Sequence, residues 1–193
     1  MEQIQPKQKY SYKDYKNWNT GLDRYELFEG EPRMMSSPSQ SHQFLSDYLM
    51  MQFMTQLLGT QCIPHSAPSD VRLFPKADES DDIILQPDIY ITYEGVPRIV
   101  IEILSPSNTA EEMEKKLRYY TSAGVKEYWI FESEYFCSIY GFNPSLSSYE
   151  YRSYTSVGGI LEIVTYSLCK DISVKINIED IPVEYRTPQL RLL

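Results

Sequence analysis

The chain has 193 residues, of which 42% are hydrophobic and 23% charged, and it carries a formal net charge of −9. This length fits one globular domain with a single core, and the 26 aromatic side chains (17 Tyr, 7 Phe and 2 Trp) exclude wholesale disorder. The acidic balance argues against a broad basic surface for nucleic acid, although it leaves room for an enzyme with a local cleft.

The cysteines and the apolar runs bear on the cellular location of the protein. Cys62, Cys137 and Cys169 are far apart and form no CxxC, so neither a zinc knuckle nor a disulfide framework is indicated. No apolar run approaches the ~18 residues of a membrane helix, and the N-terminal residues lack the apolar stretch of a signal peptide. We therefore expect a cytoplasmic protein without a membrane partner.

The first part of the chain predicts short elements. Ser11 is placed to cap a short helix over residues 12–18, with Gly21 soon after its end. A hairpin is expected around Glu29-Gly30-Glu31, between strands 24–29 and 32–35. We expect residues 1–22 to form an N-terminal extension, residues 23–185 a single domain and residues 186–193 a tail.

The middle and the end of the chain predict two helices among several strands. Apolar residues at three- and four-residue spacing favour a helix over residues 41–57, ended by Gly59, and a second helix over residues 110–122 begins after Thr109. The segment 76–82 is expected to be a solvated acidic loop. The remaining strand-like runs are residues 70–74, 88–93, 98–104, 126–132, 138–142, 149–155 and 160–164. This order predicts a mixed α/β (α+β) domain with helices packed on a central sheet.

One carboxylate lies in the middle of an apolar strand. In the run IVIEIL, the side chains of Ile99, Ile101 and Ile103 share one face, and Glu102 points to the other. A buried carboxylate is costly unless it is paired, protonated or bound to a metal. Asp88 opens the preceding strand, so the two carboxylates can converge on one face if these strands pair. Two carboxylates suit a hard divalent cation whose other ligands are water and a substrate phosphate.

A cation completes this group of residues. The helix over residues 110–122 carries Lys115 and Lys116, and a lysine near a metal can orient the attacking water and stabilise negative charge on phosphate. Adjacent helix residues point ~100° apart, so at most one of the two aims well at the site.

The ordered motifs PDIYITY, RIVIEILSPSN and KLRYYTSAGVKEYWIFE resemble the Uma-two family of restriction endonucleases, which belongs to the PD-(D/E)XK nuclease superfamily. The resemblance spans about residues 25–181. It implies a restriction-endonuclease-like core with a mixed central sheet flanked by helices, and a DNA-cleaving activity that depends on Mg²⁺ or Mn²⁺.

The resemblance assigns roles to individual residues. Asp88 and Glu102 match the two acidic positions, and the backbone carbonyl of Ile103 becomes a further metal ligand. Leu104 stands where the superfamily usually has its lysine, and Lys116 on the following helix takes that role, with Lys115 as the alternative. Asp70, Glu31 and His42 match further positions and are accessory candidates.

Several alternatives stay open from the sequence. Glu102 could be paired with Arg98 or Lys116 purely for structure, and His42 could make a local hydrogen bond. The whole protein could be a catalytically inactive nuclease-fold module for binding or assembly, or an enzyme acting on a small nucleotide, and the sequence does not decide between DNA and RNA. The aromatic late strands also suggest a homodimer.

Overall fold

The computed structural model describes residues 8–18, 23–165, 167–168 and 171–186. The chain divides into two compact units: residues 1–37 with 67–87 form the first unit, and residues 38–66 with 88–193 form the second. The expected Gly21 end of the first helix and the tail beyond residue 186 lie outside the described residues. Across the described part of the chain, no helix is long and apolar enough to cross a membrane.

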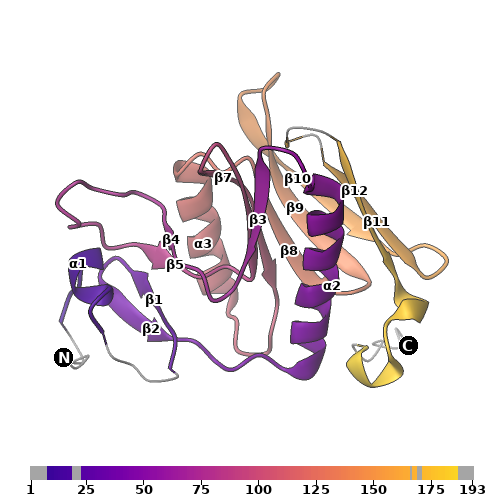
Figure 1. Ribbon diagram of the computed structural model, residues 1–193, viewed down its shortest axis with the longest axis horizontal. Coiled ribbons are helices and arrows are strands. Elements are labelled where there is room, and N and C mark those ends of the chain that lie inside the picture. Colours follow the sequence, from indigo (N-terminus) through magenta and orange to yellow (C-terminus); the bar gives the residue numbers. More distant parts are fainter. Residues whose placement is uncertain (1–7, 19–22, 166, 169–170, 187–193) are drawn as a thin grey trace. The chain divides into compact units, whose positions relative to one another are not determined.

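The first unit is a small antiparallel sheet with one short helix (Figure 1). The strands lie in the order β2-β1-β5-β4. Glu29 and Gly30 both have positive φ, 51° and 81°, as a two-residue type I′ hairpin turn requires, so the expected hairpin is confirmed. The elements are α1 (Tyr12–Tyr15), β1 (Tyr25–Phe28), β2 (Glu31–Met34), β4 (Val71–Arg72) and β5 (Ile84–Leu85).

Two expectations for the first unit were too long, and the expected solvated loop over residues 76–82 is mostly exposed but contains one buried residue. The helix begins after Ser11 as predicted, and its Asp14 carboxylate accepts hydrogen bonds from the Ser11 backbone and hydroxyl, but it ends at Tyr15. The strand expected over 70–74 is the two-residue β4. Asp81, placed in a solvated loop, is buried because Arg72 holds both of its carboxylate oxygens, at 2.8 and 2.6 Å.

The second unit is built on a six-stranded mixed sheet in the order β10-β9-β8-β7-β6-β3. β7 and β8 run parallel, and every other pair in this sheet is antiparallel. The bounds of its strands and helices are α2 (Gln40–Leu57), β3 (Cys62–Ser66), β6 (Ile89–Tyr93), β7 (Val96–Ile103), α3 (Ala110–Ser122), β8 (Glu127–Ser133), β9 (Phe136–Asn143), β10 (Ser148–Thr155), β11 (Ile160–Thr165) and β12 (Ile172–Asn177), with 3₁₀ turns at Ile178–Asp180 and Val183–Tyr185.

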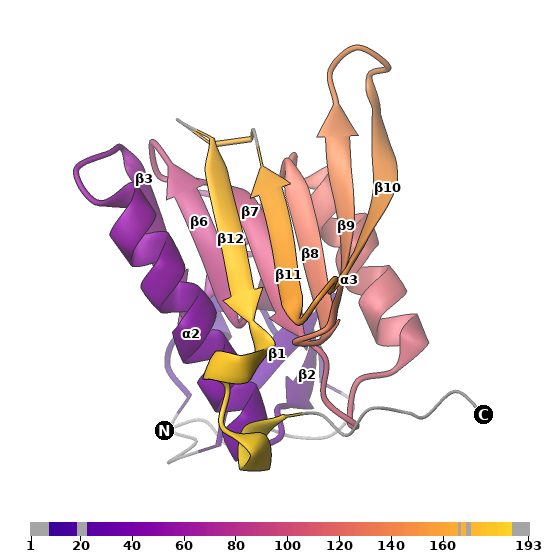
Figure 2. The same ribbon diagram turned by 90° about the vertical axis from the view of Figure 1, so that its right-hand side faces the viewer.

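Both faces of this sheet are covered (Figures 1 and 2). Helix α2 and the β11–β12 hairpin lie over one face, and α3 lies over the other. The first face holds the main core, which includes Leu49 and Phe53 of α2 and Ile163 of β11. Tyr120 of α3 and Tyr128 of β8 are buried against each other, with ring centroids 4.9 Å apart. The predicted mixed fold with helices flanking a central sheet is thereby confirmed.

Helix α2 also pairs with the backbone of the two-stranded sheet. The side-chain amide of Gln52 donates to the carbonyl of Lys175 and accepts from its N–H, at 2.6 and 2.8 Å. Gln56, one turn later, makes the same pair of bonds with Ser173, at 2.9 and 3.2 Å. These two side chains satisfy backbone groups of β12 that would otherwise be an open strand edge.

Candidate functional site

Strands β6 and β7 place the two predicted acidic residues opposite each other in the sheet register. The two strands pair antiparallel, with Ile89 opposite Ile101. Asp88, the residue before Ile89, therefore stands opposite Glu102, the residue after Ile101. The isoleucine face of β7 lies in the main core, as the alternation predicted, so Glu102 points to the α3 face. Glu102 is 6% exposed.

Asp88 is held by hydrogen bonds on one of its two oxygens. Its Oδ2 accepts the backbone N–H of Ile103 at 2.7 Å and lies 3.2 Å from Nε2 of His42. Oδ1 accepts no hydrogen bond from the described part of the chain. The carboxylate is therefore fixed through one oxygen at the end of β7.

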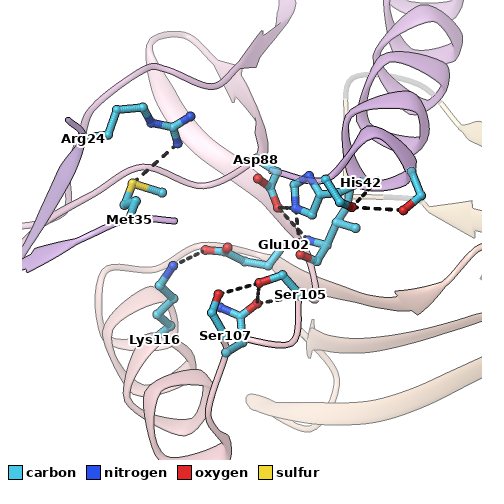
Figure 3. Close-up of polar contacts among 12 residues, drawn as sticks. Arg24, Met35, His42, Asp88, Glu102, Ser105, Ser107 and Lys116 are labelled. Carbon is cyan, nitrogen blue, oxygen red and sulfur yellow. Dashed lines mark hydrogen bonds and ion pairs between the residues drawn. The ribbon is translucent and has the colours of Figure 1, made fainter. Parts of the chain in front are cut away.

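His42 reaches this point from the first turn of α2 (Figure 3). Ser39 caps the helix by accepting the backbone N–H of His42 at 3.2 Å, which places the imidazole at the helix start. Nε2 also lies 3.0 Å from the carbonyl oxygen of Ile103. Burial lowers the pKa of His42, but its hydrogen bond to Asp88, the charges of Asp88 and Glu102, and the Ile103 carbonyl raise it above its usual value overall.

Glu102 is paired with a lysine and a tyrosine from α3. The Lys116 ammonium donates to Oε1 of Glu102 at 3.0 Å, and the Tyr120 hydroxyl donates to the same oxygen at 3.1 Å. Lys116 is only 2% exposed, so its charge is removed from water together with that of Glu102. Of the two structural partners considered for Glu102, the structure therefore selects Lys116.

The register of α3 separates the two candidate lysines. Thr109 caps this helix by accepting the N–H of Glu112, as the sequence predicted. From this start Lys116 faces Glu102, whereas Lys115 is half-buried with its ammonium 5.8 Å from the centroid of the Tyr119 ring. The preference for Lys116 over Lys115 is consistent with this orientation.

A model of the family described as "Putative restriction endonuclease" (Uma-two) matches residues 12–157. The chain belongs to the Uma-two family. This Uma-two protein also has the fold of a crystal structure described as a putative nuclease belonging to DUF820 from Anabaena variabilis ATCC 29413, with a TM-score of 0.66 and 13% identity over 89% of this chain and 96% of that one. No curated protein matches it.

In this Uma-two protein, two accessory candidates are bound within the first unit. Oδ1 of Asp70 accepts from the hydroxyl of Tyr15 and the side-chain amide of Gln86, both at 2.8 Å. Glu31 pairs with Lys9 at 2.9 Å, and both side chains are well exposed. These contacts give Asp70 and Glu31 local structural partners, and an accessory role for either remains a prediction.

The donor set suits an ion that keeps much of its own water. Among the described residues no three His, Cys, Asp or Glu side chains gather as a metal cluster. Magnesium is commonly bound by one or two carboxylates plus water and substrate phosphate, so the oxygen donors Asp88, Glu102 and the Ile103 carbonyl are of the type that such an ion uses, whereas structural zinc sites are built mainly from Cys and His.

Sequence reasoning did not foresee two contacts of this site. The first is the hydrogen bond from Tyr120 to Glu102, although the spacing of Lys116 and Tyr120 by four residues on one helix face is visible in the sequence. The second is the double contact of His42 Nε2 with Asp88 and Ile103, which depends on the start of α2 approaching the end of β7.

Proposed function

We propose that this Uma-two protein is a metal-dependent endonuclease of the PD-(D/E)XK type that hydrolyses phosphodiester bonds in DNA. The observation that carries the proposal is the placement of Glu102. It is a buried carboxylate at the end of an apolar strand, hydrogen-bonded to a buried lysine, and Asp88 stands opposite it just before the adjoining strand.

Asp88, Glu102 and the carbonyl of Ile103 would hold the ion, Mg²⁺ or Mn²⁺. When bound, such an ion activates a water molecule and neutralises charge on the scissile phosphate. The carboxylates serve this purpose because oxygen ligands suit hard divalent cations. The hydrogen bonds from Ile103 and His42 keep Asp88 in one orientation, and those from Lys116 and Tyr120 do the same for Glu102.

Lys116 is assigned the role of the superfamily lysine, since Leu104 occupies the usual position. In the reaction, the attacking water gives up a proton to solvent and its oxygen forms a new bond to phosphorus, the ester P–O bond breaks, and the leaving oxygen takes a proton from solvent. The Lys116 ammonium stabilises the extra negative charge that the phosphate oxygens carry in the transition state. A buried cation is effective in this role because little water screens it.

The net charge of −9 limits how DNA can be held. Phosphate contacts must come from a local cluster, so log affinity should fall with log salt by a slope below about 5 in magnitude. A cytoplasmic location and a homodimer remain predictions. Tyr149, one of the residues behind the expected homodimer, donates from its hydroxyl to the carbonyl of Val125 within its own chain, so it is not left over for a partner.

The test is cleavage of supercoiled plasmid by purified protein with Mg²⁺, with Mn²⁺ and with EDTA. We expect nicking or linearisation only with the ions, and its loss in Asp88→Asn and Glu102→Gln. Glu127→Gln is the matched control, because Glu127 is a buried glutamate on the next strand with its own partners. Cleavage that persists in both site variants would refute the proposal.

A second candidate is a non-catalytic module that keeps the nuclease fold. The closed contact between Lys116 and Glu102, at 3.0 Å and buried on both sides, favours this candidate because a structural ion pair needs no ion. The two candidate functions differ in whether the protein binds a divalent ion. A non-catalytic module should be indifferent to Mn²⁺, whereas the nuclease should bind Mn²⁺ and lose it in Glu102→Gln.

A further inference from the structure

His42 contacts two of the three groups assigned to the ion, and it does so with a single ring atom. Nε2 lies 3.2 Å from Oδ2 of Asp88 and 3.0 Å from the carbonyl oxygen of Ile103. Both of these oxygens are hydrogen-bond acceptors. Nε2 must therefore carry a proton and donate it, and a protonated nitrogen has no lone pair for a metal.

As a consequence, the two oxygens of the Asp88 carboxylate have different surroundings. Its Oδ2 accepts a hydrogen bond from the backbone of Ile103 at 2.7 Å and lies within ion-pair distance, 3.2 Å, of Nε2 of His42. Oδ1 takes none from the described part of the chain. The carboxylate is thus oriented through Oδ2, and Oδ1 is the oxygen that remains for an ion.

The consequence for Ile103 is similar. Its carbonyl oxygen has two lone pairs, and the bond from His42 uses one of them. The same imidazole therefore fixes the relative positions of a side chain before β6 and a backbone group at the end of β7. Its own position is set by the Ser39 cap of α2.

We propose that His42 is a positioning residue of the ion site. It donates from Nε2 toward Asp88 and Ile103, restrains the orientation of both groups, and leaves Asp88 to bind the ion through Oδ1. Loss of a hydrogen-bond partner of a metal ligand typically weakens metal binding by about 10- to 100-fold. This inference rests on the proposed ion site and assigns to His42 a role that is distinct from ligation.

The experiment is calorimetric titration of Mn²⁺ into the full chain and its variants, below the unfolding temperature of each. His42→Ala removes the donor and should weaken Mn²⁺ binding by about 10- to 100-fold. His42→Gln keeps an N–H donor at a similar reach and should restore most of the affinity. His65, the other histidine of the chain, contacts Tyr90 and Thr92, and His65→Ala should bind Mn²⁺ as the wild type does.

A second measurement does not need the ion. Long-range proton–nitrogen NMR spectra of the metal-free protein at pH 8 should show the proton of His42 on Nε2, with His65→Ala identifying the two rings. A bare Nε2 would overturn the proposal. So would tighter Mn²⁺ binding by His42→Ala, which would mean that His42 competes with the ion.

The failures of the two proposals are distinguishable. If the wild type does not bind Mn²⁺ at all, the proposed function fails and the role of His42 fails with it. If the wild type binds Mn²⁺ and loses it in Glu102→Gln, but His42→Ala binds as tightly as the wild type, only the role of His42 is refuted. A merely structural His42 would give this last result together with a lower melting temperature.

Discussion

Glu102 on β7 and Glu127 on β8 are buried glutamates in apolar strands of one sheet, 6% and 3% exposed. The two strands run parallel with Ile99 opposite Glu127 and Glu102 opposite Ile130. Glu102 therefore lies at the carboxyl end of the parallel pair on the α3 face, and Glu127 lies at its beginning on the opposite face.

The two carboxylates differ in the residues that surround them. Glu127 accepts from Arg152 and Ser167 on Oε1, at 3.1 and 2.7 Å, and from the Trp129 indole on Oε2, at 2.7 Å. Donors from three segments of the chain thus use both oxygens. Glu102 accepts hydrogen bonds from Lys116 and Tyr120 on Oε1, and Asp88 stands opposite it in the register of β6 and β7.

This difference separates a structural role from a candidate catalytic one. A carboxylate whose two oxygens are both bound by donors of its own chain is a structural connection, and an ion would have to break it. A glutamate that stands opposite another acid where two strands pair is a candidate for sharing an ion with it. Burial of a glutamate alone would not have distinguished the two.

The largest expected effect concerns the cation that accompanies each glutamate. Lys116→Gln keeps a donor for Glu102 but removes the charge, and we expect plasmid cleavage to fall by about 10²- to 10³-fold, as for the loss of one transition-state donor. Lys115→Gln is the neighbouring control and should cleave at close to the wild-type rate. If Lys115→Gln abolishes cleavage and Lys116→Gln does not, the assignment of the lysine is wrong.

For the free energy of unfolding, we expect the larger loss at Glu127 and the smaller loss at Glu102. Glu127→Ala leaves the Arg152 guanidinium and the Trp129 indole without their acceptor. We expect a loss of about 3 kcal/mol in the free energy of unfolding, at the low end for a broken buried ion pair because the Arg152 side chain is 34% exposed.

Urea unfolding monitored by tryptophan fluorescence measures this quantity. Glu102→Gln retains an acceptor for Lys116 and Tyr120 and should cost clearly less than Glu127→Ala. Equal losses in the two variants would mean that Glu102 is as structural as Glu127, and would favour the non-catalytic function.

Ion-induced stabilisation sharpens the same contrast. Mn²⁺ at 100 times its dissociation constant should raise the free energy of unfolding of the wild type by about 2.7 kcal/mol, because only the folded chain presents the site. The increase should persist in Glu127→Gln, once its lower baseline is subtracted, and vanish in Glu102→Gln. A matching increase in all three proteins would place the ion elsewhere.

The smallest effect comes from one hydroxyl at each glutamate. Tyr120→Phe removes a donor to Glu102, and Ser167→Ala removes a donor to Glu127, and each should cost about 1 kcal/mol of stability. Only Tyr120→Phe should also change the Mn²⁺ affinity measured by calorimetry. A change of affinity in Ser167→Ala would contradict the separation of the two carboxylates.

Much of this arrangement could be predicted from local patterns. The two-residue alternation of β7 placed Glu102 opposite the isoleucines, and the Thr109 cap set the register that turns Lys116 toward it. The strand over residues 172–177 was overlooked, although Ile172, Val174 and Ile176 alternate there and are all buried. The two-residue period was visible in the sequence.

Other features could not be read locally because long-range contacts create them. The edge strand β3 contains Pro64 and His65 and has no apolar alternation, so it exists through its pairing with β6. The polar loop before β5 gave no sign that Asp81 is buried by Arg72. The contact of His42 with Asp88 joins residues 46 positions apart, from a helix start to the beginning of a strand.

The central assignment is that Asp88 and Glu102 share one divalent ion, and a crystal structure grown with Mn²⁺ tests it most directly. An anomalous difference map should show one peak about 2.1 Å from Oδ1 of Asp88, from a Glu102 oxygen and from the Ile103 carbonyl, in octahedral geometry. A map without a peak at these oxygens at millimolar Mn²⁺, or with its peak at Glu127 or another site, would contradict the assignment.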